Sequence, residues 1–197
     1  MKKKPNNIIL TGFRATGKTP VGKIVAEQLG YTFLDTDVEL CRQLGASIAE
    51  VVARHGWSCF RQAEAELLVR LSLLTRQVIA TGGGAVEHQQ QWQKLRQGNF
   101  VVWLDADVAT IQSRLASDPV TANQRPALLS ARDTAENEIV VLVQRRAPLY
   151  AAGSDMRLET DGVSPAHLAA RILEALTALN DNAGGHNTIA ECSALIG

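Results

Sequence analysis

Eight residues near the N-terminus have the types and spacing of a phosphate-binding site. They read Gly12-Phe13-Arg14-Ala15-Thr16-Gly17-Lys18-Thr19, the pattern G-x-x-x-x-G-K-T. In this pattern the glycines let backbone N–H groups turn inward around phosphate oxygens. A helix that begins near Gly17 would point the positive end of its dipole at the same anion. Lys18 can reach the outer phosphates, and the Thr19 hydroxyl can ligate Mg²⁺.

The residues around this loop match the setting that the pattern requires. Residues 7–11 form a short apolar run of strand type, and apolar residues recur at helical spacing over 21–29. A strand, a glycine loop and a helix in this order favour a phosphate loop over an ordinary turn before a helix. The residues expected to hold the nucleotide are Gly12, Ala15, Thr16, Gly17, Lys18, Thr19 and Pro20.

Two carboxylates stand at the end of a second expected strand, residues 31–37. Asp35 and Asp37 are two residues apart, so they share one face if the strand continues that far. In an open parallel sheet, ligands collect at the carboxyl ends of strands. Asp35 is then placed to orient Mg²⁺ or its water molecules, and Asp37 to accept a proton from a substrate hydroxyl. The alternative is that one or both carboxylates cap the following helix.

The segment 38–74 is expected to be helical, with breaks near Gly45 and Gly56. Within it, Arg61 and Glu64 are one helical turn apart and share a face. They are either a surface ion pair, which contributes little to stability, or part of a site.

Three glycines, Gly82-Gly83-Gly84, follow a third expected strand over residues 77–81. Glycine at this place predicts a close approach of the backbone to another group. A flexible linker explains the triplet poorly, because strand-like and helical segments flank it closely.

The second half of the chain continues the alternation of strands and helices. Asp105 is expected to begin a helix after the fourth strand, and the irregular segment 117–130, which contains Arg125, is a candidate lid. The other expected elements are a helix over 88–97, a strand over 99–105, a helix over 131–147, a strand over 156–160 and a helix from Ser164-Pro165 to about Leu179.

The elements predict an α/β protein of three layers, with a five-stranded parallel sheet flanked by helices. They occupy one domain over residues 1–180, followed by a loose tail over 181–197.

The composition narrows the class of protein. The chain has 197 residues, with 46% hydrophobic and 20% charged, and its 20 Lys and Arg balance its 20 Asp and Glu. Because the charge is balanced, we expect no bulk binding of nucleic acid. No apolar run is long enough to span a membrane and no signal-peptide pattern appears, so we expect no membrane partner and a cytoplasmic location. The three cysteines and four histidines are too scattered to predict a zinc site or a disulfide framework.

Several motifs in one order resemble the shikimate kinases, which belong to the nucleoside-monophosphate-kinase-like branch of phosphate-loop proteins. The resemblance covers roughly residues 7–179. Beyond the phosphate loop, it rests on Asp35-Thr36-Asp37, Phe60-Arg61 with Glu64, Thr81-Gly82-Gly83-Gly84, Arg125-Pro126 and Arg146-Ala147-Pro148-Leu149-Tyr150. It implies a helical substrate-binding part at about 37–74 and phosphorylation of the shikimate 3-hydroxyl by ATP with Mg²⁺. We also expect a monomer.

The resemblance also implies a role for individual residues. Asp37 would hold the shikimate hydroxyls beside the accepting oxygen, and Arg61 and Arg146 would clamp the carboxylate. Glu64 would support the site. The backbone of the triplet Gly82, Gly83 and Gly84 would contact shikimate, with an N–H donated by Gly83.

The remaining implied roles concern the nucleotide and the metal. Lys18 would act on the phosphates, and Arg125 would reach them from the lid. Thr19 would hold Mg²⁺, with Asp35 acting through water. These assignments agree with the chemistry of the step, since phosphoryl transfer needs positioning and charge neutralisation rather than covalent catalysis.

The phosphate loop departs from the family pattern G-x-x-G-x-G-K-[ST]-T at two places. Ala15 replaces the middle glycine, and its methyl group disfavours a positive φ. Pro20 follows Thr19 and lacks an N–H, but in the first helical turn that group has no intrahelical partner. We therefore expect nucleotide binding to persist with an altered affinity.

Two alternatives stay open from the sequence. One is another small-molecule kinase of the same branch, acting on gluconate or a nucleoside monophosphate. The other is a nucleotide-dependent switch or regulatory module. The chain has no Asn-Lys-x-Asp motif for guanine, which weakens a GTPase interpretation.

Overall fold

The computed structural model describes residues 4–117 and 135–184, and its centre is a five-stranded parallel sheet. The strand order is β2-β3-β1-β4-β5, with every neighbouring pair parallel. The strands are β1 (Ile8–Thr11), β2 (Thr32–Asp35), β3 (Gln77–Ala80), β4 (Phe100–Asp105) and β5 (Met156–Glu159). The predicted five-stranded parallel sheet is thus confirmed.

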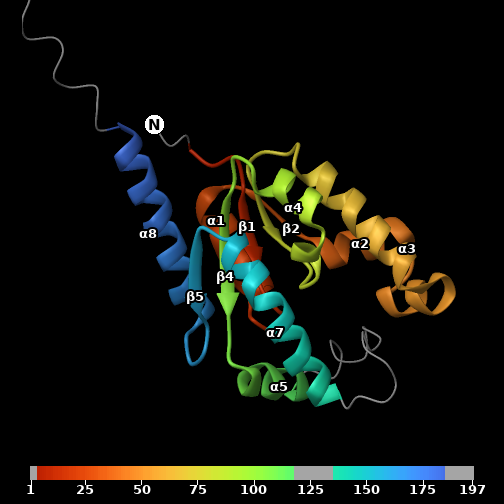
Figure 1. Cartoon of the computed structure of the whole chain (residues 1–197). Helices are drawn as coiled ribbons and strands as arrows, with labels where there is room; N and C mark the ends of the chain where they lie inside the picture. Colours follow the sequence, from red (N-terminus) through yellow and green to blue (C-terminus); the bar gives the residue numbers. More distant parts are fainter. Residues whose placement is uncertain (1–3, 118–134, 185–197) are drawn as a thin grey trace, which may run out of the picture.

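The central strands β1, β3 and β4 are largely apolar and buried because both faces of the sheet are covered there, whereas the edge strands β2 and β5 also carry polar residues. Successive side chains point to opposite faces, and the core accordingly divides in two. Ile8 and Leu10 pack with helices α1 (Lys18–Leu29) and α8 (Pro165–Gly184). Ile9 packs on the other face with α3 (Ile48–Leu71) and α4 (Gln89–Arg96). The three predicted layers are therefore present (Figure 1).

The remaining helices extend the layers at the ends of the strands. They are α2 (Thr36–Leu44), the short turn η1 (Ala85–Glu87), α5 (Val108–Ser117) and α7 (Ala135–Gly153). Helices α2 and α3 form a lobe beside the sheet, with α5 and α7 near the carboxyl end of β4 (Figure 1).

The predicted breaks in the helical segment 38–74 are confirmed. Gly45, with φ 64°, ends α2, and Gly56, with φ 77° and ψ 168°, kinks α3. Ser47 and Glu50 form a reciprocal capping box that begins α3. These turns carry Arg61 and Glu64 back toward the sheet.

Four boundaries differ from the sequence predictions. α7 continues to Gly153, six residues past the predicted end at 147, with Pro148 inside the helix. β2 ends at Asp35, so Asp37 lies in the first turn of α2 and not on the strand. Asp105 belongs to β4, and α5 begins three residues later. The last helix continues to Gly184. No glycine precedes Gly184 within this helix, and Asn180 and Asp181 disfavour a helix only weakly. Residues 181–184 are thus helical and not part of a loose tail.

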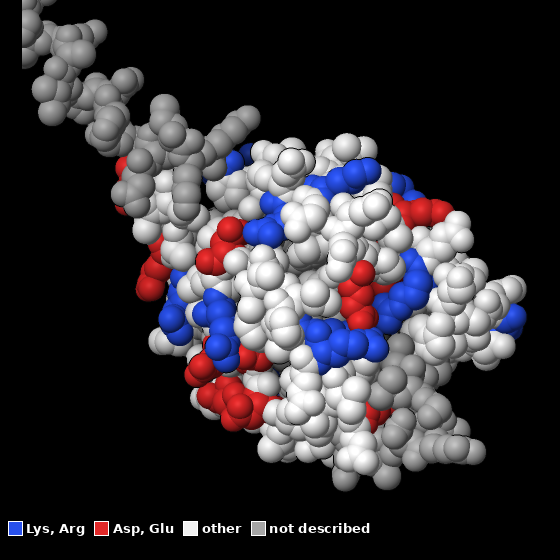
Figure 2. All heavy atoms as spheres, viewed as in Figure 1, with Lys and Arg blue, Asp and Glu red and all other residues white. Residues whose placement is uncertain are grey.

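The predicted lid over 117–130 lies, apart from Ser117, outside the described residues, as do Arg125 and residues 185–197. Within the described part of the chain, no helix is both long and apolar enough to cross a membrane. Basic and acidic side chains are interspersed over the face that Figure 2 shows.

Candidate active site

The phosphate loop joins the end of β1 to the start of α1 and depends on glycine at two positions. Gly12 has φ 136°, and a Cβ atom there would lie 2.2 Å from the carbonyl oxygen of Leu104. Gly17 has φ 90° and is the N-cap of α1. L-residues disfavour both conformations. The backbone therefore turns at the mouth of the sheet with the amino end of α1 directed toward it.

Ala15 adopts the left-handed conformation that its methyl group disfavours, with φ 63°. Its carbonyl oxygen accepts a 3.1 Å hydrogen bond from Nη1 of Arg114. The same guanidinium donates to the hydroxyl and carbonyl oxygens of Thr160. Arg114 thus ties the loop to the end of β5, a role that its place in the sequence does not reveal.

The side chains of the other loop residues either line the ligand cavity or stabilise the loop. Lys18 Nζ donates to the carbonyl oxygens of Gly12 at 2.9 Å and Phe13 at 2.6 Å. The buried Thr16 hydroxyl also donates to Phe13, at 2.8 Å, so its side chain supports the loop. Pro20 lies in the first turn of α1, where its missing N–H removes no helical hydrogen bond.

Thr19 and Asp35 meet beside the loop. The Thr19 hydroxyl donates to Asp35 Oδ2 at 2.8 Å, and Asp35 Oδ1 accepts from the N–H of Asp37 at 3.0 Å. Asp35 is therefore both the N-cap of α2 and the neighbour of Thr19. A hydroxyl and a carboxylate are oxygen ligands of the kind that Mg²⁺ uses alongside water and phosphate. The donor set fits Mg²⁺.

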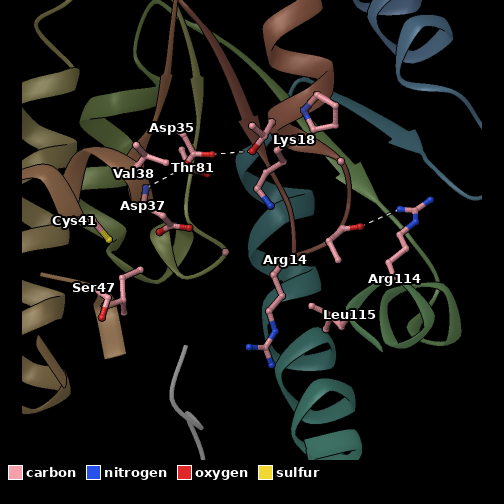
Figure 3. A pocket seen from close by; sticks show the side chains of 16 residues that line it. Arg14, Lys18, Asp35, Asp37, Val38, Cys41, Ser47, Thr81, Arg114 and Leu115 are labelled. Carbon is pink, nitrogen blue, oxygen red and sulfur yellow. Dashed lines mark hydrogen bonds between the residues drawn. The ribbon is translucent and has the colours of Figure 1, made fainter. Parts of the chain in front are cut away.

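A cavity of about 870 Å³ opens in front of these residues, a volume suited to a nucleotide-sized ligand. Lys18, Asp35 and Asp37 face this space (Figure 3). Its lining includes Arg14, Ala15, Gly17, Lys18, Thr19, Pro20, Asp35, Asp37, Thr81, Gly83 and Arg114. Gly12 and Thr16 lie behind this lining, in the buried part of the loop.

The glycine triplet lies against three charged side chains. A Cβ atom on Gly82 would be 2.7 Å from Asp37 Oδ1 and 3.0 Å from Glu64 Oε1. A Cβ atom on Gly84 would be 2.2 Å from Nη1 of Arg61. The predicted close approach to the backbone is confirmed, and the groups that approach it are the protein's own.

Gly83 differs from its neighbours. A Cβ atom there would make only ordinary contacts. Its carbonyl oxygen accepts a 2.6 Å hydrogen bond from the Tyr150 hydroxyl. Its N–H makes no hydrogen bond with another described residue, whereas the N–H of Gly82 is held by the Thr36 hydroxyl. The Gly83 N–H is thus available to a ligand.

A second, smaller pocket adjoins the large cavity. Its lining comprises Asp37, Ile48, Trp57, Phe60, Arg61, Glu64, Gly83, Gly84 and Arg146. Asp37 and Gly83 line both pockets. The fold therefore brings together Arg61 of α3 and Arg146 of α7, 85 residues apart in the sequence, in one pocket with Asp37.

The two arginines are held by carboxylates. Arg61 donates to Glu64 Oε2 at 2.6 Å and lies over the rings of Trp57 and Phe60. Burial raises the pKa of Glu64, but hydrogen bonds and charges from His88 and Arg61 outweigh it, and the pKa lies below its ordinary value. The buried Arg146 donates to Glu87 Oε2.

Arg14 is a further cationic side chain at this site. It lines the large cavity, and its buried Nε has no hydrogen-bond partner in the described structure. Burial lowers the pKa of Arg14, with opposing effects of Glu138, which raises it, and Arg146, which lowers it. As a variable position of the loop motif, Arg14 gave no signal in the sequence, and neither did Glu87 or His88.

Comparison with known proteins agrees with this geometry. Residues 14–177 match the family model described as shikimate kinase. The chain belongs to the shikimate kinase family. A shikimate kinase from Moorella thermoacetica is 42% identical over 174 residues, which cover 88% of this chain and 96% of the relative. One from Oleidesulfovibrio alaskensis is 46% identical over 143 residues, which cover 73% of this chain and 81% of the relative.

A solved structure shares both the family and the fold. The shikimate kinase from Acinetobacter baumannii in complex with shikimate is 33% identical, with a TM-score of 0.80. The match covers 90% of this chain and 95% of that protein. Shikimate kinases thus resemble this chain over nearly the whole described domain, including both pockets.

Proposed function

We propose that this protein transfers the γ-phosphoryl group of ATP to the 3-hydroxyl of shikimate. The observation that carries the proposal is the pair of adjoining pockets that share Asp37 and Gly83. One pocket has a phosphate loop and the other has two arginines, so an anionic acceptor and a nucleotide would meet at Asp37. Membership of the shikimate kinase family supports shikimate as that acceptor.

In the small pocket, Arg61 and Arg146 receive the carboxylate of shikimate. Guanidinium groups suit this task because they keep their charge and donate several hydrogen bonds in a plane. Glu64 supports Arg61. The backbone of Gly83 and Gly84 forms the adjoining wall, with Gly82 behind it against Asp37 and Glu64. The Gly83 N–H donates to a substrate oxygen. The acceptor is then oriented with its hydroxyls toward Asp37.

At the junction, Asp37 accepts the proton of the 3-hydroxyl as that oxygen bonds to the γ-phosphorus. The bond from this phosphorus to the oxygen bridging the β- and γ-phosphates breaks, and its electron pair leaves with ADP. Lys18 and the backbone N–H groups from Gly12 to Thr19 offset the charge on the phosphate oxygens. These residues act by position and charge.

Thr19 and Asp35 would hold Mg²⁺, Thr19 directly and Asp35 through water. When bound, the ion supplies positive charge that neutralises the phosphates. Three further assignments remain predictions: Arg125 acting on the phosphates, a monomeric state and a cytoplasmic location.

The experiment is a coupled assay of ADP release with shikimate, gluconate, AMP or no acceptor. Among these four reactions, we expect ADP release only in the one that contains shikimate. Mass spectrometry should confirm that shikimate 3-phosphate forms in it. Release with gluconate or AMP would assign another kinase of the same branch. Binding of ATP without release in any reaction would indicate a nucleotide-binding regulatory module.

A further inference from the structure

Two adjacent residues, Glu87 and His88, follow the glycine triplet. Glu87 contacts both arginines, and His88 contacts Glu64, the carboxylate that holds Arg61. Glu87 accepts hydrogen bonds on Oε2 from Arg146, from Nε at 3.1 Å and Nη2 at 2.8 Å. Oε2 also lies 4.0 Å from Nη2 of Arg61. His88 Nε2 lies 2.8 Å from Oε2 of Glu64, the oxygen that holds Arg61. Neither Glu87 nor His88 lines either pocket.

The contact with Glu87 sets the direction of the buried Arg146 guanidinium. Nε and Nη2 both donate to Glu87, whereas Nη1 makes no hydrogen bond within the described residues. Because the guanidinium is planar, fixing two nitrogens fixes the third. The two N–H groups of Nη1 and the second N–H of Nη2 are left for a ligand in the small pocket.

The contact with His88 holds the support of Arg61. Glu64 is 2% exposed, and its Oε2 accepts from Arg61 at 2.6 Å. The pKa of Glu64 is lowered despite its burial, so the carboxylate is ionised near neutral pH. An ionised carboxylate only accepts hydrogen bonds, and Nε2 of His88 must therefore carry a proton. His88 limits the positions open to Glu64 and, through it, to Arg61.

Charge gives a reason for this arrangement. Arg61 and Arg146 come from different helices and repel each other when they converge on one pocket. The carboxylate of Glu87 lies within 4.0 Å of both, which offsets that repulsion before substrate arrives. A second positive charge, Arg145, binds the other oxygen of Glu87 at 2.7 Å and keeps the carboxylate turned toward α7.

We propose that Glu87 and His88 are positioning residues that hold Arg146 and Arg61 ready for the substrate carboxylate, Glu87 directly and His88 through Glu64. The inference rests on the proposed function, because it takes the two arginines as the carboxylate clamp. Preorganised donors cost less to order when the ligand binds. Loss of either residue should therefore weaken the binding of shikimate more than it slows phosphoryl transfer.

The test is steady-state kinetics of Glu87→Gln and His88→Ala, with melting temperatures measured in parallel. We expect the KM for shikimate to rise about tenfold or more, the effect of losing one charged hydrogen bond. We also expect kcat and the KM for ATP to stay within about twofold of the parent. His88→Gln retains an N–H donor and should recover most of the affinity for shikimate.

Glu39→Gln is the matched control. Glu39 is about as exposed as Glu87 and also binds an arginine, Arg42, but it lines neither pocket. The KM values of the Glu39→Gln variant should therefore equal those of the parent. Parental shikimate KM in Glu87→Gln and His88→Ala would overturn the inference. An equal rise in the KM values for shikimate and ATP together with a lower melting temperature, neither of them recovered in His88→Gln, would also overturn it. That pattern marks a structural role. A parent enzyme that releases no ADP with shikimate would instead overturn the proposed function and this inference with it.

Discussion

The hydroxyl of Thr19 donates a 2.8 Å hydrogen bond to Oδ2 of Asp35, which joins the first turn of α1 to the end of β2. The other carboxylate oxygen caps α2 through the N–H of Asp37. One side chain thus fixes the register between the phosphate loop and the helix that carries Asp37. Because the two oxygens of Asp35 have different partners, a substitution of Asp35 can separate its role as a helix cap from its role in metal binding.

Asp35→Asn should keep the cap and weaken the response to Mg²⁺. Asparagine caps a helix about as well as aspartate, so the melting temperature should stay close to the parent's. Loss of the charge should raise the Mg²⁺ concentration for half-maximal rate by roughly tenfold or more. A Mg²⁺ titration of ADP release measures this. Asp105→Asn, at the end of β4 and outside both pockets, is the control. An unchanged Mg²⁺ response would leave Asp35 as a cap only.

Asp37→Asn should be folded and nearly inactive. Asp35 is the N-cap of α2, so the Asp37 carboxylate is not needed for that task and the melting temperature should change little. A neutral amide cannot take the proton of the substrate hydroxyl, and kcat should fall by roughly two orders of magnitude or more. ATP binding should persist. Near-parental turnover would remove Asp37 from the reaction.

Gly84→Ala should weaken shikimate binding without unfolding the protein. Gly84 has φ −91° and ψ −6°, which alanine accepts, but its Cβ would lie 2.2 Å from Nη1 of Arg61. The end of a long side chain can move, so Arg61 should shift and the KM for shikimate rise about tenfold. In an Arg61→Ala background the same change should have little further effect, because coupled residues are not additive. Additive losses would show that Gly84 acts elsewhere.

Ala15→Gly should leave the fold as stable or slightly more stable. The left-handed conformation of Ala15, with φ 63°, costs about 1–2 kcal/mol. Glycine removes that cost but gives the unfolded chain ~0.4–1 kcal/mol of additional entropy. The net gain is then about 1.6 kcal/mol or less, which corresponds to a rise of at most about 6 °C in Tm. Ala26→Gly, in the buried face of α1, should lower Tm, and a fall for Ala15→Gly as well would contradict the argument.

Glu64 should make the protein sensitive to acid in a predictable direction. Its folded pKa is lowered, so its contribution to stability is present above the unfolded pKa of about 4.3 and is lost as the pH falls through the folded value. Glu64→Gln should therefore be less stable than the parent at pH 6, with a difference in Tm that shrinks toward pH 3. Thermal melts at both pH values measure it. A difference independent of pH would show that the carboxylate charge is not responsible.

Local patterns determined much of this protein. The phosphate loop, the five short strands, the end of α2 at Gly45 and the kink at Gly56 follow from glycine placement and apolar periodicity, which act over a few residues. The same patterns identified Asp35, Asp37, Arg61 and the glycine triplet as chemically important. Their order along the chain was enough to suggest the family.

The tertiary structure decided which of these side chains meet and what supports them. Whether β2 ends at Asp35 or Asp37 depends on pairing with β3, and that boundary turned Asp35 into both a cap and the partner of Thr19. Glu87 and Arg146 lie 59 residues apart, and Arg114 and Ala15 lie 99 apart. Such contacts arise from the packing of helices on the sheet. Because neither hydrophobic periodicity nor a motif encodes the partner of a polar side chain, only the folded chain could reveal them.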